Sequence, residues 1–563
     1  MKHPLYFYSL AILTVLLLTL PLHAEGARPT PEPKSKASAV ASLPDSLTPL
    51  APLTPRIHGP SVYGVRPGSP FLFAIPATGS RPMTFTAEGL PKGLSLDSAT
   101  GRITGSVVQV GTNAVTLIAR NDKGESKHSL KIVVGEQISL TPPMGWNSWN
   151  CWGGKVSQEK VLSSAEAMKA SGLDQHGWTY INIDDGWQGK RGGSWNAIQP
   201  NSKFPDIKAL ADQIHGMGLS FGIYSTPWRG SYEGHIGSSC DNQNGVYDWI
   251  ESGDHNEYYR IGKTEVAFNQ MAAGAQNEAA RNKSKEGAEI MAKRKSNWKF
   301  GTYPFQEQDA KQWAEWGVDY LKYDWNPIDV PHVEAMVNAL RATGRDIVYS
   351  LSNSAPFQNA ADWQHLSNLW RTTGDINDSW KSMSGIGFGK QTAWAAYQGP
   401  GHFNDPDMLV VGRVGWGNPH PSNLTPDEQY SHVSLWCLLS APLLLGCDLE
   451  HLDLFTLGLI TNDEVLAIDQ DELCKPAVCV SPEGPLKVYV KELADGTKAV
   501  GLFNTGETPA QVTLDWKQAG FSGKQILRDL WRQKDLGAFD GSYGAEVPVH
   551  GVILLKVSPE KRG

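Results

Sequence analysis

The sequence alternates short apolar runs with amphipathic runs from Leu140 to Asp471. The apolar runs have the length of buried strands, and the runs between them repeat apolar residues at helical spacing, several ending in Gly. A strand–helix unit repeated about eight times is the pattern of a (β/α)8 barrel. A doubly wound open sheet is the alternative, but no Gly-rich phosphate turn follows any of the strands. We therefore expect a (β/α)8 TIM barrel over residues 138–472.

The expected elements of this barrel follow from the two periodicities. Strands are expected at Met144–Trp149, Tyr180–Ile183, Ser220–Tyr224, Tyr320–Tyr323, Asp346–Ser350, Leu369–Thr373, His402–Asn404 and Pro442–Leu445. Helices are expected at Glu159–Ala170, Ile207–Met217, Asp309–Trp316, Val333–Ala342 and Thr425–Leu439.

The N-terminus, residues 1–24, has the features of a secretory signal peptide. Lys2 supplies a basic start, Leu10–Leu20 is an apolar core, and Ala24 ends a small-residue exit. The apolar run is too short to span a bilayer comfortably, and nothing later in the chain is long and apolar enough. We expect a secreted or periplasmic protein with no membrane association after signal cleavage.

The rest of the chain divides by composition. Residues 25–55 are rich in Pro, Ser, Ala and Lys, which is typical of a flexible linker. Residues 56–135 and 480–560 each show short alternating strands, which predicts an N-terminal Ig-like β-sandwich and a C-terminal antiparallel β-sandwich. A polar insertion at 229–304 interrupts the barrel after its third strand. A loop this long is often functional, and we expect it to overhang the barrel mouth, as a wall of the pocket or a contact with a partner subunit.

The charge and the cysteine content indicate which partners, metals and disulfides can be expected. The 563 residues carry a formal net charge of −8 and no basic run, so no nucleic-acid partner is expected. No Cys/His spacing resembles a zinc site, and we expect no metal and no cofactor. Export would permit disulfides; Cys474 and Cys479 are close enough in sequence to pair, whereas Cys437 and Cys447 flank an apolar segment and are expected to be buried. A homo-oligomer is left open.

Polar and aromatic residues stand at or just past the ends of the expected strands. The carboxyl ends of parallel barrel strands meet at one mouth, where catalytic groups collect. A helix N-cap explains any single carboxylate there equally well, but the whole set points to one site. The set is Trp149, Asp184, Asp185, Tyr224, Lys322, Asp324, Arg371, Asp375 and Asp407.

Two of these carboxylates suit cleavage of a glycosidic bond with retention. That chemistry needs an ionised carboxylate and a protonatable carboxyl about 5–5.5 Å apart. Asp324 suits the nucleophile, because Lys322 projects to the same strand face and favours the ionised form. Asp375 suits the acid/base, because an apolar surround from Trp370 and Trp380 is expected to raise its pKa.

Five segments in order resemble glycoside hydrolase family 27, which contains α-galactosidases and α-N-acetylgalactosaminidases. They are Pro143–Trp149 (PMGWNSW), Ile183–Trp187 (IDDGW), Lys322–Asp324 (KYD), Arg371–Trp380 (RTTGDINDSW) and Asn404–Leu409 (NDPDML). Separately, Leu90–Gly105 (LPKGLSLDSATGRITG) resembles immunoglobulin-like, cadherin-related modules of bacterial secreted enzymes, for which a role as a spacer or in weak glycan docking is expected.

The resemblance implies a role for each residue of the site. Asp324 matches the family nucleophile and Asp375 its acid/base. The matches to sugar-binding residues are Asp184 and Asp185 for O4 and O6, Lys322 for O3 and O4, Arg371 toward O2, Trp149 and Tyr224 as an aromatic wall, and Asp407 with Met408 lining the pocket. The implied activity is removal of terminal non-reducing α-D-galactosyl residues from oligosaccharides or polysaccharides by double displacement.

The residues after the fifth strand leave the substrate open. Family α-galactosidases commonly carry Glu and a bulky residue where this chain has Ser352 and Ala355. Small residues there resemble the α-N-acetylgalactosaminidases, whose pocket admits an acetamido group. Alternatively, Asn353 or a group from the 229–304 insertion replaces the Glu. A β-L-arabinopyranosidase and a non-catalytic carbohydrate-binding barrel are further alternatives.

Overall fold

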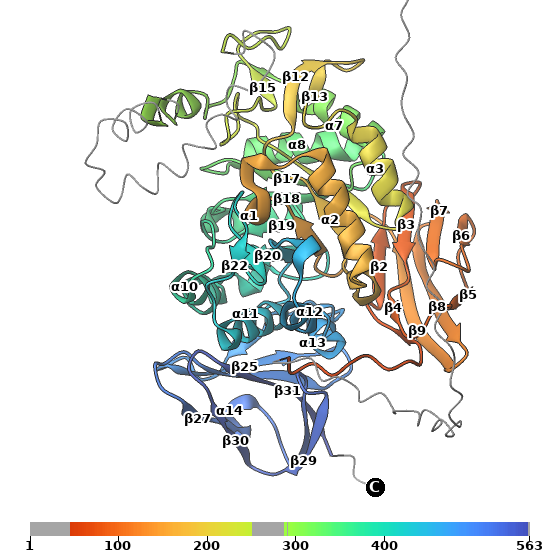
Figure 1. Ribbon diagram of the computed structural model, residues 1–563, viewed down its shortest axis with the longest axis vertical. Helices are drawn as coiled ribbons and strands as arrows, with labels where there is room; N and C mark the ends of the chain where they lie inside the picture. The colour runs from red at the N-terminus through yellow and green to blue at the C-terminus, as the bar shows by residue number, and fades with distance from the viewer. Residues whose placement is uncertain (1–45, 250–286, 290, 561–563) are drawn as a thin grey trace, which may run out of the picture. The chain divides into compact units, whose positions relative to one another are not determined.

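The structure, a computed structural model, describes residues 46–249, 287–289 and 291–560 (Figure 1). The expected signal peptide at 1–24 and most of the expected linker at 25–55 lie outside these ranges. Within them, no helix combines the length and apolarity needed to cross a bilayer.

The central domain is a curled sheet of eight parallel strands (Figure 1). In chain order these are β10 (Met144–Asn147), β11 (Tyr180–Asn182), β14 (Ser220–Ser225), β17 (Tyr320–Asp324), β18 (Val348–Ser352), β19 (Leu369–Arg371), β20 (Phe403–Asp405) and β23 (Leu443–Leu445). Their spatial order is β20-β19-β18-β17-β14-β11-β10-β23. A parallel bridge between Leu409, just past β20, and Leu445 of β23 joins the two ends of the sheet. This order confirms the (β/α)8 barrel, and the doubly wound sheet is excluded.

The strands alternate between the barrel interior and the surrounding helices. On β17, Leu321 and Tyr323 belong to the large core shared with the helices, whereas Tyr320 belongs to a separate apolar cluster formed by strand residues. The period of two along a strand places Lys322 and Asp324 on the same side as Tyr320. The register pairs Lys322 with Ser350 and Asp324 with Ser352. The interior is therefore apolar at the start of the strands and becomes charged toward their carboxyl ends.

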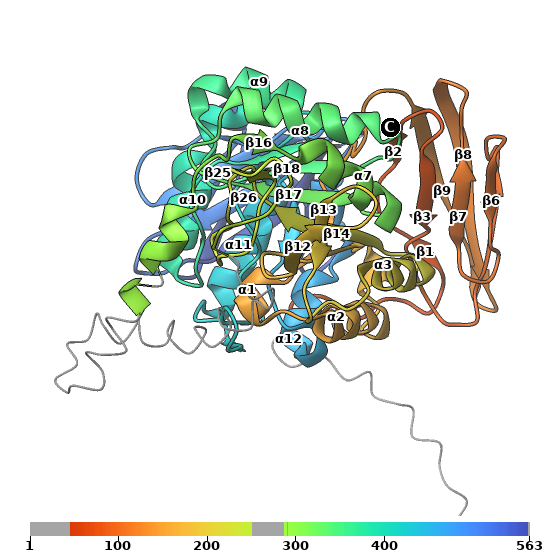
Figure 2. The same cartoon turned by 90° about the horizontal axis from the view of Figure 1, so that it is seen from above.

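Helices cover the outside of the sheet, as Figure 2 shows for those beside β14, β17 and β18. They are α2 (Gln158–Ala170), α3 (Ile207–Gly216), α7 (Gln306–Trp316), α8 (Val330–Ala342), α9 (Ala360–Leu366), α10 (Trp380–Lys390) and α11 (Pro426–Leu438). All five expected helices are present. The start of α11 illustrates the cause, because Thr425 and Glu428 form a capping box and Pro426 occupies the first helical turn.

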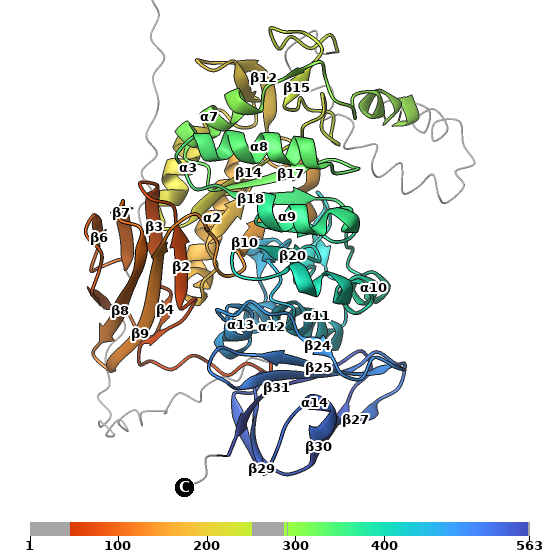
Figure 3. The same ribbon diagram turned by 180° about the vertical axis from the view of Figure 1, so that it is seen from behind.

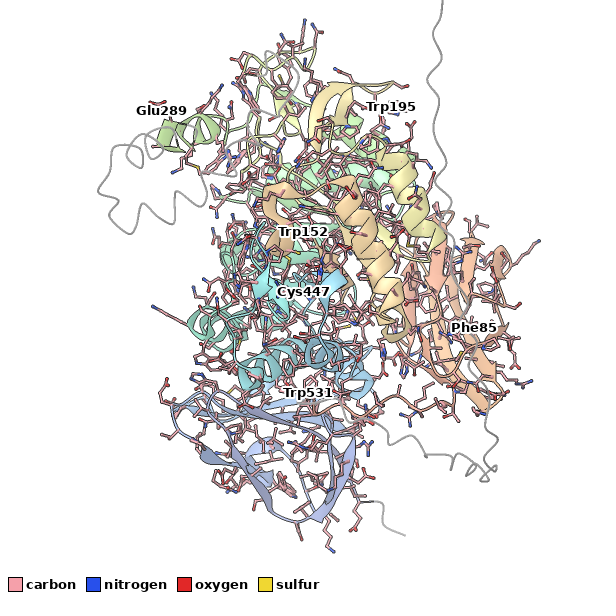
Figure 4. The ribbon with its side chains drawn as sticks, viewed as in Figure 1. Phe85, Trp152, Trp195, Glu289, Cys447 and Trp531 are labelled. Carbon is pink, nitrogen blue, oxygen red and sulfur yellow. The ribbon has the colours of Figure 1, made fainter. Side chains whose placement is uncertain are left out.

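The N-terminal domain is a β-sandwich, as predicted. One sheet has the order β2 (Val62–Val65), β9 (Gly124–Val134), β8 (Gly111–Asn121), β5 (Thr84–Glu88), and the other β3 (Pro70–Ala74), β7 (Arg102–Ser106), β6 (Leu94–Leu96). Figure 4 labels Phe85, one of its core residues. Arg66 binds the carboxylate of Asp346 at 2.6 Å, just before β18. The fifth barrel strand begins at Val348, two residues later than expected, and Asp346 is engaged in this contact.

The end of the expected linker is attached to the catalytic domain. The Leu47 backbone N–H donates to the Tyr430 hydroxyl on α11 at 2.8 Å, and the side chain of Asn462 donates to Thr48 at 3.1 Å. Residues 47 and 48 are therefore fixed rather than free.

The C-terminal domain is an antiparallel β-sandwich packed on α11 (Figure 3). Its larger sheet has the order β24 (Val478–Cys479), β25 (Leu486–Glu492), β26 (Lys498–Asn504), β31 (Val552–Pro559), β28 (Gln525–Asp529), β29 (Lys534–Phe539), and its smaller one pairs β27 (Ala510–Asp515) with β30 (Ser542–Val547). The indole N–H of Trp531, labelled in Figure 4, donates to Ser434 of α11 at 2.9 Å.

The expected disulfide is absent. All six cysteines lie in the described ranges and all are free. The Cys474 thiol is instead directed to the carbonyl of Leu140 at 3.2 Å, while Cys479 belongs to β24. Cys437 and Cys447 are buried, as expected.

Candidate active site

Lys322 and Asp184 form a buried ion pair at the barrel mouth. The Lys322 ammonium lies 2.8 Å from Asp184 Oδ2 and 5.6 Å from the centre of the Tyr224 ring. Burial alone would lower the pKa of Lys322, but the charges of Asp184 and Asp324 raise it above its ordinary value. Lys322 is therefore a permanent cation that ties β17 to β11.

Asp185 lies next to this pair and is held by the start of the insertion. Its carboxylate accepts hydrogen bonds from the Glu233 backbone N–H at 2.9 Å and from the Gln188 amide at 3.2 Å. Burial, together with the Glu233 charge, raises the pKa of Asp185 to about 7. A carboxylate has about four acceptor positions, so Asp185 keeps capacity for hydroxyl donors.

Arg371 connects two carboxylates on the other side of Asp324. Its guanidinium lies 2.7 Å from Asp407 and 3.2 Å from Asp375. Asp407, at φ 87°, also accepts the backbone N–H groups of Ile376 and Met408, each at 2.8 Å. Burial, against the Arg371 charge, raises the pKa of Asp407 to about 6. Arg371 thus holds the Asp375 carboxylate, and Asp407 holds the backbone N–H of the next residue, Ile376.

Asp324 is nearly enclosed, with 7% of its surface exposed. Its Oδ1 has no hydrogen-bond partner among the described residues. Burial raises the pKa of Asp324 to about 7, Lys322 opposes that rise, and the charge of Asp375 adds to it. Asp375 therefore acts on the titration of Asp324 as a like charge.

The environment of Asp375 differs from the expectation. Its side chain is 72% exposed. Trp370 is fully buried in the helix-facing core, and the Trp380 ring stacks on His550 at 4.0 Å, so the expected apolar surround is wrong. Desolvation works to raise the pKa of Asp375, but Arg371 and Lys322 outweigh it and hold the pKa below its ordinary value.

The remaining predicted residues lie around this mouth. Ser352 ends β18, is buried, and pairs in register with Asp324, and Ala355 is also buried. Trp149 begins the short helix α1 (Trp149–Trp152) and packs against the apolar cluster that contains Met408. Within the described ranges, no group of three or more His, Cys, Asp or Glu side chains is arranged to hold a metal ion.

Tyr232 is a neighbour of the site that was not singled out from the sequence. Its hydroxyl accepts a hydrogen bond from the Asn353 side chain at 3.1 Å. Burial, with the charges of Asp324 and Asp375, raises its pKa above its ordinary value, and the next residue, Glu233, donates its backbone N–H to Asp185 at 2.9 Å. The described part of the insertion therefore walls the site. Two aromatic residues shortly after a barrel strand, Trp228 and Tyr232, are the sequence signal that could have identified it.

A parallel barrel that carries a buried carboxylate at the end of one strand, Asp324, and a second carboxylate, Asp375, held by Arg371 at the end of another has the architecture of a carbohydrate-cleaving barrel enzyme. Comparison with known proteins agrees with this class. Residues 141–251 and 289–471 match the family model described as alpha galactosidase A, and residues 483–557 match the alpha galactosidase C-terminal beta sandwich domain. Residues 54–135 match an Ig domain. The chain belongs to the alpha galactosidase A family.

Individual relatives span most of the chain. Alpha-galactosidase 2 of Arabidopsis thaliana is 33% identical over 440 residues, covering 77% of this chain and 93% of its own. A Bacteroides fragilis protein of known structure is 32% identical with a TM-score of 0.74, covering 90% of this chain and 98% of its own. A β-L-arabinopyranosidase of Geobacillus stearothermophilus is 28% identical with a TM-score of 0.60, covering 75% of this chain and 98% of its own.

Proposed function

We propose that this protein is a retaining α-galactosidase that releases terminal non-reducing α-D-galactosyl residues from oligosaccharides or polysaccharides. The observation that supports the proposal is the placement of two carboxylates at the barrel mouth: Asp324 is enclosed at the end of β17 with an Oδ1 that is unpartnered among the described residues, and Asp375 is held at 3.2 Å by Arg371 at the end of β19. Family membership and the α-galactosidase relatives support the substrate class.

In the first step, the Asp324 carboxylate attacks the anomeric carbon while the bond from that carbon to the leaving oxygen breaks. Asp375 gives its proton to the leaving oxygen, and a glycosyl-enzyme ester forms. In the second step, Asp375 takes a proton from water, the water oxygen bonds to the anomeric carbon, and the ester bond to Asp324 breaks. Each step inverts the anomeric centre, so the configuration is retained.

The sugar ring would be held by groups on both sides of Asp324. We assign Asp184 and Asp185 to the 4- and 6-hydroxyls, Lys322 to the 3- and 4-hydroxyls, and Arg371 to the 2-hydroxyl side. Buried acceptors that are left without a hydroxyl donor cost free energy. The pair at 184 and 185 would therefore reject an epimer whose 4-hydroxyl points elsewhere. Trp149, Tyr224 and Met408 would supply apolar contact.

Variants of the two carboxylates test the mechanism. Asp324→Asn should abolish turnover of 4-nitrophenyl α-galactoside and keep galactose binding, because the nucleophile is lost but the pocket is not. Asp375→Ala should slow substrates with good leaving groups less than natural galactosides in the first step, because such leaving groups need little protonation. Asp212→Asn, an exposed carboxylate on α3, is the matched control. Ordinary turnover by Asp324→Asn would contradict the assignment and would leave the non-catalytic barrel as the better explanation.

An α-N-acetylgalactosaminidase is the second candidate, and the small, buried Ser352 and Ala355 favour it. Side-by-side hydrolysis of 4-nitrophenyl α-galactoside, α-N-acetylgalactosaminide and β-L-arabinopyranoside separates the candidates. We expect the galactoside to have the highest kcat/KM.

We also propose export, on the basis of the signal features at residues 1–24. N-terminal sequencing of the protein recovered outside the cytoplasmic membrane should find a start near residue 25. Recovery of the uncleaved chain from the cytoplasm alone would contradict this proposal.

A further inference from the structure

Tyr232 reaches the barrel mouth from the insertion and contacts the turn that follows β18. Its hydroxyl accepts a hydrogen bond from Asn353 Nδ2 at 3.1 Å. A phenol is both an acceptor and a donor. Within the described ranges, the Asn353 contact is the one hydrogen bond of this hydroxyl, and no described group accepts its proton. The proton is available to a bound ligand.

The backbone around Tyr232 is fixed on both sides. The preceding carbonyl, of Ser231, accepts the Trp298 indole N–H at 3.1 Å, and the following N–H, of Glu233, donates to Asp185 at 2.9 Å. The Tyr232 ring packs edge-on against Trp298 and Trp228, with ring centres 4.8 Å and 5.5 Å away. Side chains locked by packing hold a binding group more precisely than a free loop does.

Asn353 is held in a strained turn. Asn353 and Ser354 have positive φ angles of 78° and 62°, which residues other than Gly rarely adopt. Two bonds tie the turn to β19 and to the segment that follows it. The Ala355 N–H donates to the carbonyl of Arg371 at 2.8 Å, and the Ser354 N–H donates to that of Thr373 at 3.1 Å. Backbone strain of this kind persists where the surroundings enforce it, and it clusters at binding sites.

The position of Tyr232 relative to Asp324 indicates which part of a sugar it meets. In the sheet order, β11 with Asp184 lies to one side of β17, and β18 and β19 lie to the other. On the proposed function, the anomeric carbon sits over Asp324 and the 4- and 6-hydroxyls point toward Asp184 and Asp185. The ring edge that carries C2 then faces the side of β18 and β19, where Asn353 and Tyr232 meet.

Electrostatics keeps Tyr232 a hydrogen-bond donor. Burial, with the neighbouring charges of Asp324 and Asp375, raises the pKa of Tyr232 above its ordinary value. The phenol therefore stays protonated while a carboxylate beside it is ionised.

We propose that Tyr232, positioned by Asn353, reads the 2-substituent of the sugar beside Arg371. Its hydroxyl donates to the 2-hydroxyl of a galactoside, and its ring occupies the space that a 2-acetamido group would need. This inference rests on the proposed function, and it explains how a chain with small residues at 352 and 355 selects galactose.

The test compares three substrates that differ at C2: 4-nitrophenyl α-galactoside, its 2-deoxy analogue and 4-nitrophenyl α-N-acetylgalactosaminide. Tyr232→Phe should lower kcat/KM at least tenfold for the galactoside and less than twofold for the 2-deoxy analogue, because only the former has the 2-hydroxyl. Tyr232→Ala should raise the ratio of acetamido sugar to galactoside kcat/KM at least tenfold. Asn353→Ala, which releases the phenol without removing it, should move that ratio in the same direction.

Tyr303→Phe is the matched control, because Tyr303 is an exposed tyrosine of the same insertion on β16 (Tyr303–Pro304). Equal losses on the galactoside and the 2-deoxy analogue in Tyr232→Phe would overturn the inference, as would an unchanged ratio in both alanine variants. These failures presuppose a wild-type protein that hydrolyses the galactoside. A wild type that does not hydrolyse it refutes the proposed function instead.

Discussion

Replacing Asp324 with Asn should stabilise the folded protein at alkaline pH. Asp324 is buried, with 7% of its surface exposed, and burial raises the pKa of its carboxyl from 3.8 to about 7. A pKa difference of one between the folded and unfolded states corresponds to about 1.4 kcal/mol of folding free energy. Holding Asp324 ionised in the folded state therefore costs about 4 kcal/mol relative to the unfolded chain.

The sign of the effect follows from proton binding. Between the ordinary pKa of 3.8 and about 7, the folded state keeps a proton that the unfolded state has lost. The free energy of unfolding consequently falls as pH rises through this window. Asn does not ionise and carries no such cost. Asp324→Asn should thus exceed the wild type in stability by up to about 4 kcal/mol near pH 8.5, and by little near pH 4.

Urea unfolding followed by tryptophan fluorescence at both pH values measures this difference. The comparison of variant with wild type cancels the titrations that the two proteins share. Asp375→Asn is a control of opposite sign, because the pKa of Asp375 is lowered and its ionised form contributes stability above its ordinary pKa. A stability difference for Asp324→Asn that is the same at both pH values would refute the reasoning.

Three further outcomes are expected. Arg191→Met should lower the free energy of unfolding by about 3–5 kcal/mol, because it leaves the fully buried Asp309 carboxylate without the partner that lies 2.6 Å away. Urea titrations measure this loss, and an unchanged unfolding midpoint would contradict it. Arg371→Gln should raise the pKa of Asp375 and move the acid limb of the kcat/KM–pH profile to higher pH, whereas an unmoved limb would separate Arg371 from that titration. In the wild type the alkaline limb should fall near pH 7, where the pair of Asp324 and Asp375 loses its last proton and none is left for the leaving oxygen, and full activity at about pH 9 would exclude this assignment.

The fold could be predicted because periodicity and strand ends are local properties of a sequence. The strand β17 shows this, since its alternation places Tyr320, Lys322 and Asp324 on one face whatever surrounds it. The predicted start of β18 was two residues early, at Asp346, a residue that Arg66 of another domain engages. No local pattern carries that contact.

The environment of the site was harder to predict than its residues. The two tryptophans near Asp375 in sequence suggested an apolar surround, yet Trp370 faces the helices and Trp380 stacks on His550 of the C-terminal domain. The group that does face Asp375 is Arg371, four residues earlier. Tyr232 was missed because its contact with Asn353 joins positions 121 residues apart. Such neighbours are defined by tertiary structure alone.

The protonation of the free site bears on how the double displacement begins. The chemistry needs one proton on the carboxyl pair, held by the acid/base, whereas in the free protein the raised pKa of Asp324 and the lowered pKa of Asp375 favour the reverse placement. Interacting carboxyl groups titrate as a pair, so a pair that holds one proton can carry it on either Asp324 or Asp375. A sugar bound in the mouth would cover the exposed Asp375 and remove it from water, which raises its pKa. Substrate binding can therefore move the proton from Asp324 to Asp375 without uptake from solvent, which activates the nucleophile only when there is something to attack.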